Sequence, residues 1–203
     1  SLDSYNLSDT ASLSSSSSIP TSIIRSVVVV GGTHGNEYTG VWCIRHLEAN
    51  PTEKERYSTL KIDTVLGNPR AHAANRRFID DDLNRQFAVD RLVVAAAKVK
   101  AEEEDGSSDT TKISYEAQRA LELDAQLGSK LQSNNNDDEE PKTDLIVDLH
   151  TTTTNMGITL IIPEADAFLA QAAAYVLDQC QRRFPNATEK NQIVMHPLPN
   201  RLD

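Results

Sequence analysis

The chain has 203 residues, a formal net charge of −10 and a sequence pI near 4.9. So acidic a protein is not expected to bind nucleic acid phosphates or anionic membranes, and an anionic ligand requires locally placed cations. Its apolar runs are far shorter than the about 20 residues of a transmembrane helix. Two cysteines, Cys43 and Cys180, are too few for a disulfide framework. These properties predict a cytoplasmic protein without nucleic acid or membrane partners.

The chain opens with a stretch that is poor in apolar side chains. Serine dominates residues 1–22, and such a composition cannot offset the entropy lost on ordering. We therefore expect a disordered arm followed by one folded domain at residues 23–203. Because the first residue is Ser1 and not Met, we expect the sequence to be incomplete.

The first half of the domain predicts strands followed by helices. Residues 23–30 form a β-branched run typical of a strand buried on both faces. Residues 38–48 have apolar side chains at helical spacing, and the helix is expected to end before Pro51. A second strand is predicted at residues 60–66, and a turn and an irregular polar segment follow it up to Gln86.

The second half continues the alternation of strands and helices. Helices are predicted at residues 89–104, 115–131 and 165–183, and strands at residues 144–150, 158–162 and 192–195. Acidic loops are expected at about residues 102–112 and 133–142. The pattern predicts an α/β fold with a mixed, largely parallel central sheet and flanking helices.

A glycine-rich segment directly after the first strand contains two residues that can bind a metal. His34 and Glu37 lie three residues apart in a turn that enters a helix, and their side chains can converge on one ion. The carboxyl end of a buried strand is also where α/β sheets place ligands. Taken alone, the pair fits equally a turn in which both side chains only hydrogen-bond nearby backbone.

A third metal-binding residue follows another strand. His150 ends the strand at residues 144–150, and parallel strand ends gather at one edge of a sheet. His, Glu and His form a donor set of catalytic zinc sites. Asp148 lies two residues earlier and could orient His150, although a solvated carboxylate fits this position as well.

Cations that could bind an anionic ligand occur in two short motifs. Arg70 follows the second strand, and Asn84 with Arg85 lies in the irregular segment. Arginine pairs bidentately with carboxylates, but a surface ion pair with residues 80–82 is an alternative for either arginine. Solvent exposure is expected for the neighbouring pair, Arg76 and Arg77.

Together these motifs resemble the aspartoacylase and succinylglutamate desuccinylase family, which is related in fold to zinc carboxypeptidases. The resemblance covers about residues 27–197 and is strongest in four motifs: Gly31-Gly32-Thr33-His34-Gly35-Asn36-Glu37, Asn68-Pro69-Arg70, Ile79-Asp80-Asp81-Asp82-Leu83-Asn84-Arg85 and Asp148-Leu149-His150-Thr151-Thr152. A further segment, Asn155-Met156-Gly157, is similar to the aspartoacylase branch.

The resemblance implies roles for these residues. Three would bind one Zn²⁺ per chain: His34, Glu37 and His150. Asn84 and Arg85 would bind the α-carboxylate of a small anionic N-acyl amino acid, and Arg70 would stabilise the oxyanion formed at the acyl carbonyl. Residues 23–203 would then be an incomplete N-terminal zinc hydrolase domain, and a homodimer is left open.

The general base of the family is not matched in this sequence. In the family a glutamate in a Gly-x-Glu-x-Gly segment lies beyond a His-Pro pair, whereas here the chain stops at Asp203. Glu164 occurs too early to take that place. We therefore expect the chain as given to bind metal better than it turns over substrate.

The resemblance favours a metal-dependent amidohydrolase acting on N-acetylaspartate. Succinylglutamate is the closest alternative substrate. No feature of the sequence indicates the size of the pocket for the acyl group, so the choice between the two substrates depends on the resemblance. A zinc-binding module without activity is a third hypothesis. A nucleotide-binding domain is disfavoured because residues 31–37 lack a Gly-x-Gly-x-x-Gly pattern.

Overall fold

The structure, a computed structural model, describes residues 24–105, 113–131, 142–151, 157–164, 166–186 and 191–196. The serine-rich arm and most of both predicted acidic loops lie outside these ranges.

Parallel strands form the centre of the fold. Strands β1 (Ser26–Gly31), β2 (Lys61–Leu66) and β3 (Leu145–Leu149) form one sheet in the order β2-β1-β3. Strands β4 (Thr159–Pro163) and β5 (Gln192–His196) pair in a second sheet. Every pairing among the described strands is parallel. The predicted α/β class is confirmed, with its described strands hydrogen-bonded as two sheets.

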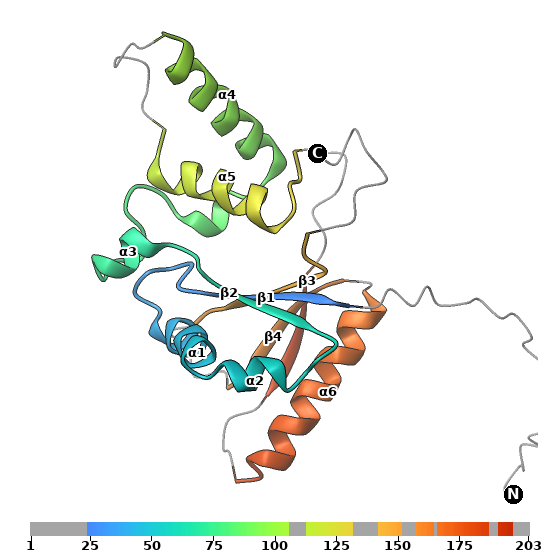
Figure 1. The fold of residues 1–203 in the computed structure, drawn as a ribbon. Coiled ribbons are helices and arrows are strands. Elements are labelled where there is room, and N and C mark those ends of the chain that lie inside the picture. Colours follow the sequence, from blue (N-terminus) through green and yellow to red (C-terminus); the bar gives the residue numbers. More distant parts are fainter. Residues whose placement is uncertain are drawn as a thin grey trace, which may run out of the picture.

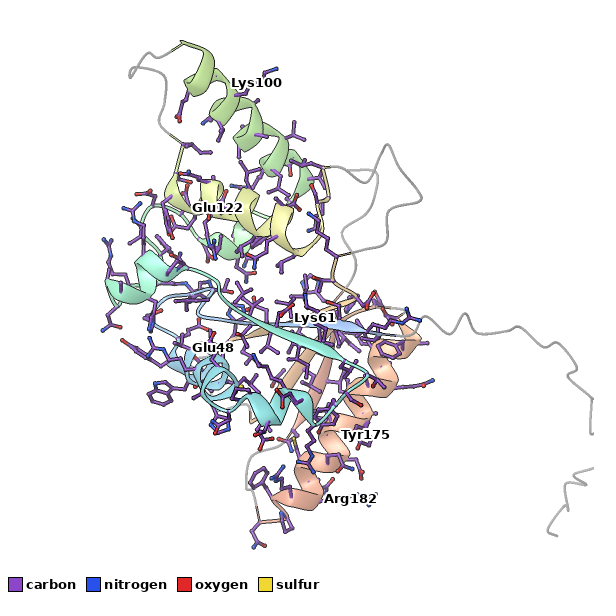
Figure 2. All side chains as sticks on the ribbon, in the orientation of Figure 1. Glu48, Lys61, Lys100, Glu122, Tyr175 and Arg182 are labelled. Carbon is purple, nitrogen blue, oxygen red and sulfur yellow. The ribbon has the colours of Figure 1, made fainter. Side chains whose placement is uncertain are left out.

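Helices cover both faces of the larger sheet (Figure 1). Helix α1 (Tyr38–Ala49) and the short α2 (Pro51–Glu55) lie on one side, and α4 (Val89–Asp105) and α5 (Tyr115–Leu127) lie on the other. Helix α6 (Ala167–Arg183) packs against β4 and β5. Its exposed face carries Tyr175 and Arg182 (Figure 2).

The main core lies between the sheet and the helix pair α4–α5. Alternate side chains of β1, Val28 and Val30, are 4% and 6% exposed and point to that side. They join Leu92 of α4 and Leu123 of α5, which are 0% and 2% exposed. Leu83, also fully buried, belongs to the same cluster. The segment that carries Asn84 and Arg85 is thus fixed to the core by its neighbour.

Two short helices lie in segments that were predicted as a helix end and a turn. Asn50-Pro51 ends α1 as predicted, but α2 begins at Pro51. Helix α3 (Pro69–Ala73) begins at Pro69 in the same way, and the Asn68 side chain caps it by accepting from the Ala71 amide at 3.0 Å. Proline suits the first helical position because its fixed φ is helical and its missing N–H has no helical partner there.

The predicted helix at residues 115–131 ends earlier than expected. Helix α5 stops at Leu127, and Gly128 adopts a φ of +129°. This conformation is rarely accessible to other residues, so the glycine terminates the helix although Leu131 continues the apolar spacing. In the irregular segment, Leu83–Arg85 forms a single 3-10 turn, η1.

Close backbone contacts bring the loop after β1 against its neighbours. A Cβ on Gly31, the last residue of β1, would lie 2.4 Å from the Gly40 carbonyl of α1, and a Cβ on Gly35 in the loop would lie 2.2 Å from the Ala71 carbonyl carbon of α3. Only glycine allows such approaches. The loop is therefore held between two helices. No helix among the described residues combines the length and apolarity needed to cross a membrane.

Candidate metal centre

The loop between β1 and α1 brings His34 and Glu37 together. The His34 Nδ1 and Glu37 Oε1 atoms lie 2.7 Å apart, and the two residues are 3% and 7% exposed. The Glu37 amide also donates to the His34 carbonyl at 3.0 Å, which closes the turn. Glu37 immediately precedes helix α1. Both side chains are therefore shielded from bulk water.

His150 completes the group from the end of β3. Its Nδ1 atom lies 3.1 Å from Glu37 Oε2, and the Thr151 amide donates to the same oxygen at 2.7 Å. Because β3 pairs in parallel with β1, both strands end at one edge of the sheet. One potential ligand atom from each of three residues lies within 4.8 Å of the others: His34, Glu37 and His150. The structure thus brings the predicted metal-binding residues together.

An aspartate contacts the second nitrogen of each imidazole. His34 Nε2 lies 2.9 Å from Asp82 Oδ1, and His150 Nε2 lies 2.7 Å from Asp148 Oδ2. The hydroxyl of Thr33 donates to Asp148 Oδ1 at 2.8 Å. Each aspartate can therefore hold an Nε2–H proton and leave Nδ1 on the side of Glu37, as carboxylates do beside metal-binding histidines. Asp148 lies where the sequence hypothesis requires, whereas the contact of Asp82 was not anticipated.

Neighbouring groups shift the pKa values of His150 and Asp82 in the directions that favour the charged form of each side chain. The hydrogen bond to Asp148 raises the pKa of His150, partial burial opposes this, and the charges of Asp148 and Glu37 add to the rise. Burial acts to raise the pKa of Asp82, but the hydrogen bond and charge of His34, with Asn84 and Arg77, outweigh it and lower the pKa. The site therefore favours a positive charge near the imidazoles.

Arg77, which was expected to be solvated, takes part in this network. Its side chain is 50% exposed, yet Nη1 lies 3.4 Å from Glu37 Oε1 and Nη2 lies 3.6 Å from Asp82 Oδ2. The backbone contributes as well, since the Gly35 amide donates to the Arg77 carbonyl at 3.1 Å. Arg76 and Arg77 are both exposed as expected, but Arg77 also contacts two acidic side chains of the site. Nothing in the sequence around Arg77 signals its contact with Glu37, which lies 40 residues away.

The predicted substrate-binding residues lie on the segments around the site. Asn84 and Arg85 are exposed on η1, and the Asn84 amide donates at 3.0 Å to Asp82 Oδ1, the oxygen that contacts His34. Arg70 is exposed on α3, where its guanidinium carbon lies 4.4 Å from the centre of the Tyr115 ring. Neither predicted arginine shows the surface ion pair with residues 80–82 among the described contacts.

Two further sequence interpretations have different outcomes. Asn155 and Met156, which carried the likeness to the aspartoacylase branch, lie outside the described residues. Glu164 is exposed in a turn after β4, and its amide donates to the His196 carbonyl at 2.8 Å.

The donor set fits a zinc ion. Two imidazole nitrogens and a carboxylate oxygen are zinc donors, and three protein ligands leave a position for water or substrate. The two histidine–glutamate contacts require protons that a bound cation would displace, because zinc binds neutral imidazole and ionised carboxylate. The aspartates on the opposite nitrogens favour the required tautomers.

The fold and site together define a parallel α/β protein with a candidate metal centre at the carboxyl edge of its sheet. Comparison with known proteins specifies the class further. The family model of the succinylglutamate desuccinylase/aspartoacylase catalytic domain matches residues 23–191. The chain belongs to this family.

Relatives that are named for different substrates have comparable sequence identity to the chain. It is 36% identical over 157 residues to a "Probable aspartoacylase" of Nostoc sp., which covers 76% of this chain and 45% of the relative. It is 38% identical over 157 residues to an N-acyl-aromatic-L-amino acid amidohydrolase (carboxylate-forming) of Xenopus laevis, covering 77% of this chain and 44% of the relative. The chain thus spans less than half the length of these relatives.

A solved structure supports the fold assignment. The crystal structure of a mutant murine aminoacylase 3 matches with a TM-score of 0.61 and 32% sequence identity. The match covers 87% of this chain and 49% of that chain. The arrangement of strands and helices described above is therefore that of the family.

Proposed function

We propose that the chain forms the metal-binding part of a zinc-dependent hydrolase that cleaves the amide bond of an N-acyl amino acid. The observation that carries the proposal is the convergence of His34, Glu37 and His150 within 4.8 Å. Membership of a family of deacylases supports the reaction class. When bound, zinc supplies Lewis acidity toward the amide carbonyl and toward water.

Each residue of the chain would have a defined task in this reaction. Asp82 and Asp148 hold the Nε2 protons of the two histidines and so keep Nδ1 available for the metal. Asn84 and Arg85 would bind the carboxylate of the amino acid, because a guanidinium pairs with it bidentately. Arg70 would stabilise the negative charge that develops on the acyl oxygen.

We propose N-acetylaspartate as the leading substrate, with aspartate and acetate as the products. The family and the aspartoacylase relative support it. N-acyl aromatic amino acids are a second candidate, because amidohydrolases named for them are 38% identical to the chain. N-succinylglutamate is the third, since the family includes desuccinylases.

Parallel kinetics on three amides test both the reaction and its substrate. N-acetyl-L-aspartate, N-acetyl-L-tyrosine and N-succinyl-L-glutamate are each incubated with the zinc-loaded whole hydrolase of which this chain is proposed to be the metal-binding part, and release of the free amino acid is followed. We expect the highest kcat/KM for N-acetyl-L-aspartate and a loss of activity after chelation. Activity that persists without metal would contradict the proposed reaction, and a preference for another amide would replace the proposed substrate.

Metal content tests the site independently of turnover. His34→Ala and His150→Ala should each lose stoichiometric zinc, measured by plasma mass spectrometry after dialysis, because each removes one of three ligands. His46→Ala, at an exposed position on α1, is the matched control. Full zinc retention in both site variants would refute the assignment.

A further inference from the structure

Glu116 is a fully buried carboxylate that the proposed chemistry does not use. It lies in the first turn of α5, is 0% exposed, and no sequence motif singled it out. Its Oε1 atom accepts from the Ile79 amide at 2.7 Å and from Asn68 Nδ2 at 2.9 Å. Its Oε2 atom accepts from the amides of Asp80 and Asp81 at 2.9 and 3.0 Å. One side chain thus satisfies four donors from two separate segments.

Both of these segments lead into the residues proposed to bind substrate. Asn68 caps α3, the helix that carries Arg70. Residues 79–81 run directly into Asp82, whose side chain contacts His34 Nε2, and then into η1 with Asn84 and Arg85. The buried carboxylate therefore connects the two cationic segments through hydrogen bonds.

The contacts require an ionised carboxylate at this position. Burial acts to raise the pKa of Glu116, but the amides of Ile79, Asp81 and Asp80 and the side chain of Asn68 outweigh it and lower the pKa. All four neighbours are donors, so the side chain must offer only acceptors. A glutamine would turn an NH2 group toward at least one of these N–H groups.

Other residues of α5 contact the same two segments. The Tyr115 amide donates to Asp80 Oδ2 at 2.9 Å, and the Tyr115 ring lies under the Arg70 guanidinium at 4.4 Å. One turn later, Arg119 Nε donates to the Gly67 carbonyl at 2.9 Å. The start of α5 is thus a common support for the segments that follow β2.

We propose that Glu116 is a positioning residue for substrate binding, which holds Arg70, Asn84 and Arg85 in the spacing that an N-acyl amino acid requires. This inference rests on the proposed function and adds to it the residue on which the geometry of the anion-binding segments depends. Glu116 acts through its neighbours, since its carboxylate is buried beneath them. Its loss should weaken substrate binding more than metal binding.

The test compares Glu116→Gln with Glu122→Gln in the zinc-loaded protein. Glu122 lies on the same helix, but its side chain is 53% exposed (Figure 2). Isothermal titration with N-acetyl-L-aspartate should show binding about tenfold weaker or worse in Glu116→Gln, equivalent to about 1.4 kcal/mol. Zinc content should match the wild type, and Glu122→Gln should bind normally. Where turnover is measured, KM should rise while kcat changes little.

Several outcomes would overturn this inference. A folded Glu116→Gln with wild-type affinity would do so, as would a variant that loses zinc and substrate binding together, because its effect would then be on the whole fold. Failure of the wild type to hydrolyse the amide, with binding that still depends on Glu116, would remove the proposed function alone. A wild-type protein that binds none of the three amides would contradict both the proposed function and this inference.

A second variant covers the case in which Glu116→Gln does not fold. Asp80→Ala removes only the exposed side-chain acceptor for the Tyr115 amide and leaves the buried carboxylate in place. It should weaken N-acetyl-L-aspartate binding several-fold and speed hydrogen exchange at the amides of Asp80 and Asp81. Unchanged affinity and exchange would contradict the role assigned to this support.

Discussion

At the residue scale, both histidines of the candidate metal centre make the same pair of contacts, one with Glu37 and one with an aspartate. Each imidazole turns Nδ1 toward Glu37 and Nε2 toward an aspartate, Asp82 for His34 and Asp148 for His150. The two aspartates come from different segments, so the orientation of each ring is set independently. Their removal should thus affect metal affinity without removing a ligand.

Asp82→Ala is expected to weaken zinc binding about 10- to 100-fold, because the His34 ring loses the acceptor that fixes its tautomer. Competition with a chromogenic chelator measures the affinity. Asp81→Ala is the control, since Asp81 is exposed and contributes to the described network through its backbone amide. Equal zinc affinity in Asp82→Ala and the wild type would rule out this role for Asp82.

The buried carboxylate of Glu116 is expected to stabilise the fold near neutral pH and to lose this contribution in acid. Its folded-state pKa is lowered, so the ionised carboxylate stabilises the fold above its unfolded pKa, and this contribution is lost as pH falls through the folded value. The free energy of unfolding of the wild type should exceed that of Glu116→Gln near neutral pH, and the difference should shrink from about pH 4 downward. Urea titrations at several pH values measure it. A difference that is constant with pH would contradict the assignment.

At the element scale, the long periodic segments could be predicted from sequence and the short helices could not. The β-branched run before Gly31 and the apolar spacing of residues 38–48 follow directly from strand and helix periods. Helices α2 and α3 have five residues each, too few to show a period. Their beginnings could be recognised only from proline after asparagine.

The residues of the site also fall into two groups, those that a sequence pattern predicts and those that it does not. His34 and Glu37 could be predicted from spacing, and His150 from the rule that parallel strands end at one edge. Asp82 and Arg77 could not, because neither residue follows a strand end, and their contacts with the ligands, across 48 and 40 residues, leave no local pattern. The sequence contains the residue types, but only the packed loops show which ones meet.

Because the metal-binding loop packs closely against α3 at Gly35, a larger residue at this position should destabilise the protein. Gly35→Ala would place a Cβ 2.2 Å from the Ala71 carbonyl carbon and 2.3 Å from the His72 nitrogen. Backbone atoms on both sides must move apart, so we expect about 1–3 kcal/mol of destabilisation and weaker zinc binding. Urea denaturation measures the first effect. Ala73→Ser, at an exposed position of α3, should change neither quantity.

At the scale of the whole molecule, the metal centre joins parts of the chain that lie far apart in sequence. Glu37 and His150 are 113 residues apart, and the sheet that aligns them passes through the centre of the fold (Figure 1). A ligand that bridges such segments binds the folded state and not the unfolded chain. Zinc should therefore stabilise the entire domain rather than one loop.

Zinc at 100 times its dissociation constant is expected to add about 2.7 kcal/mol to the free energy of unfolding. A thermal melt with and without added zinc should show one cooperative transition that shifts upward with the metal. His150→Ala should lose the shift while His46→Ala keeps it, since only the former lies in the centre. A shift of equal size in both variants would place the stabilising metal elsewhere.

The pairing of β1 with β3 also bears on how the protein folds. Val27 lies opposite Leu145 in the sheet, so folding must close a loop of more than 100 residues before His150 can approach the other two ligands. Loop closure of this length is entropically costly, and non-local pairings slow folding. Metal capture should be a late kinetic event that follows formation of the β1–β3 pair. During synthesis, a chain that has exposed His34 and Glu37 must wait for the second half before a three-ligand centre can exist.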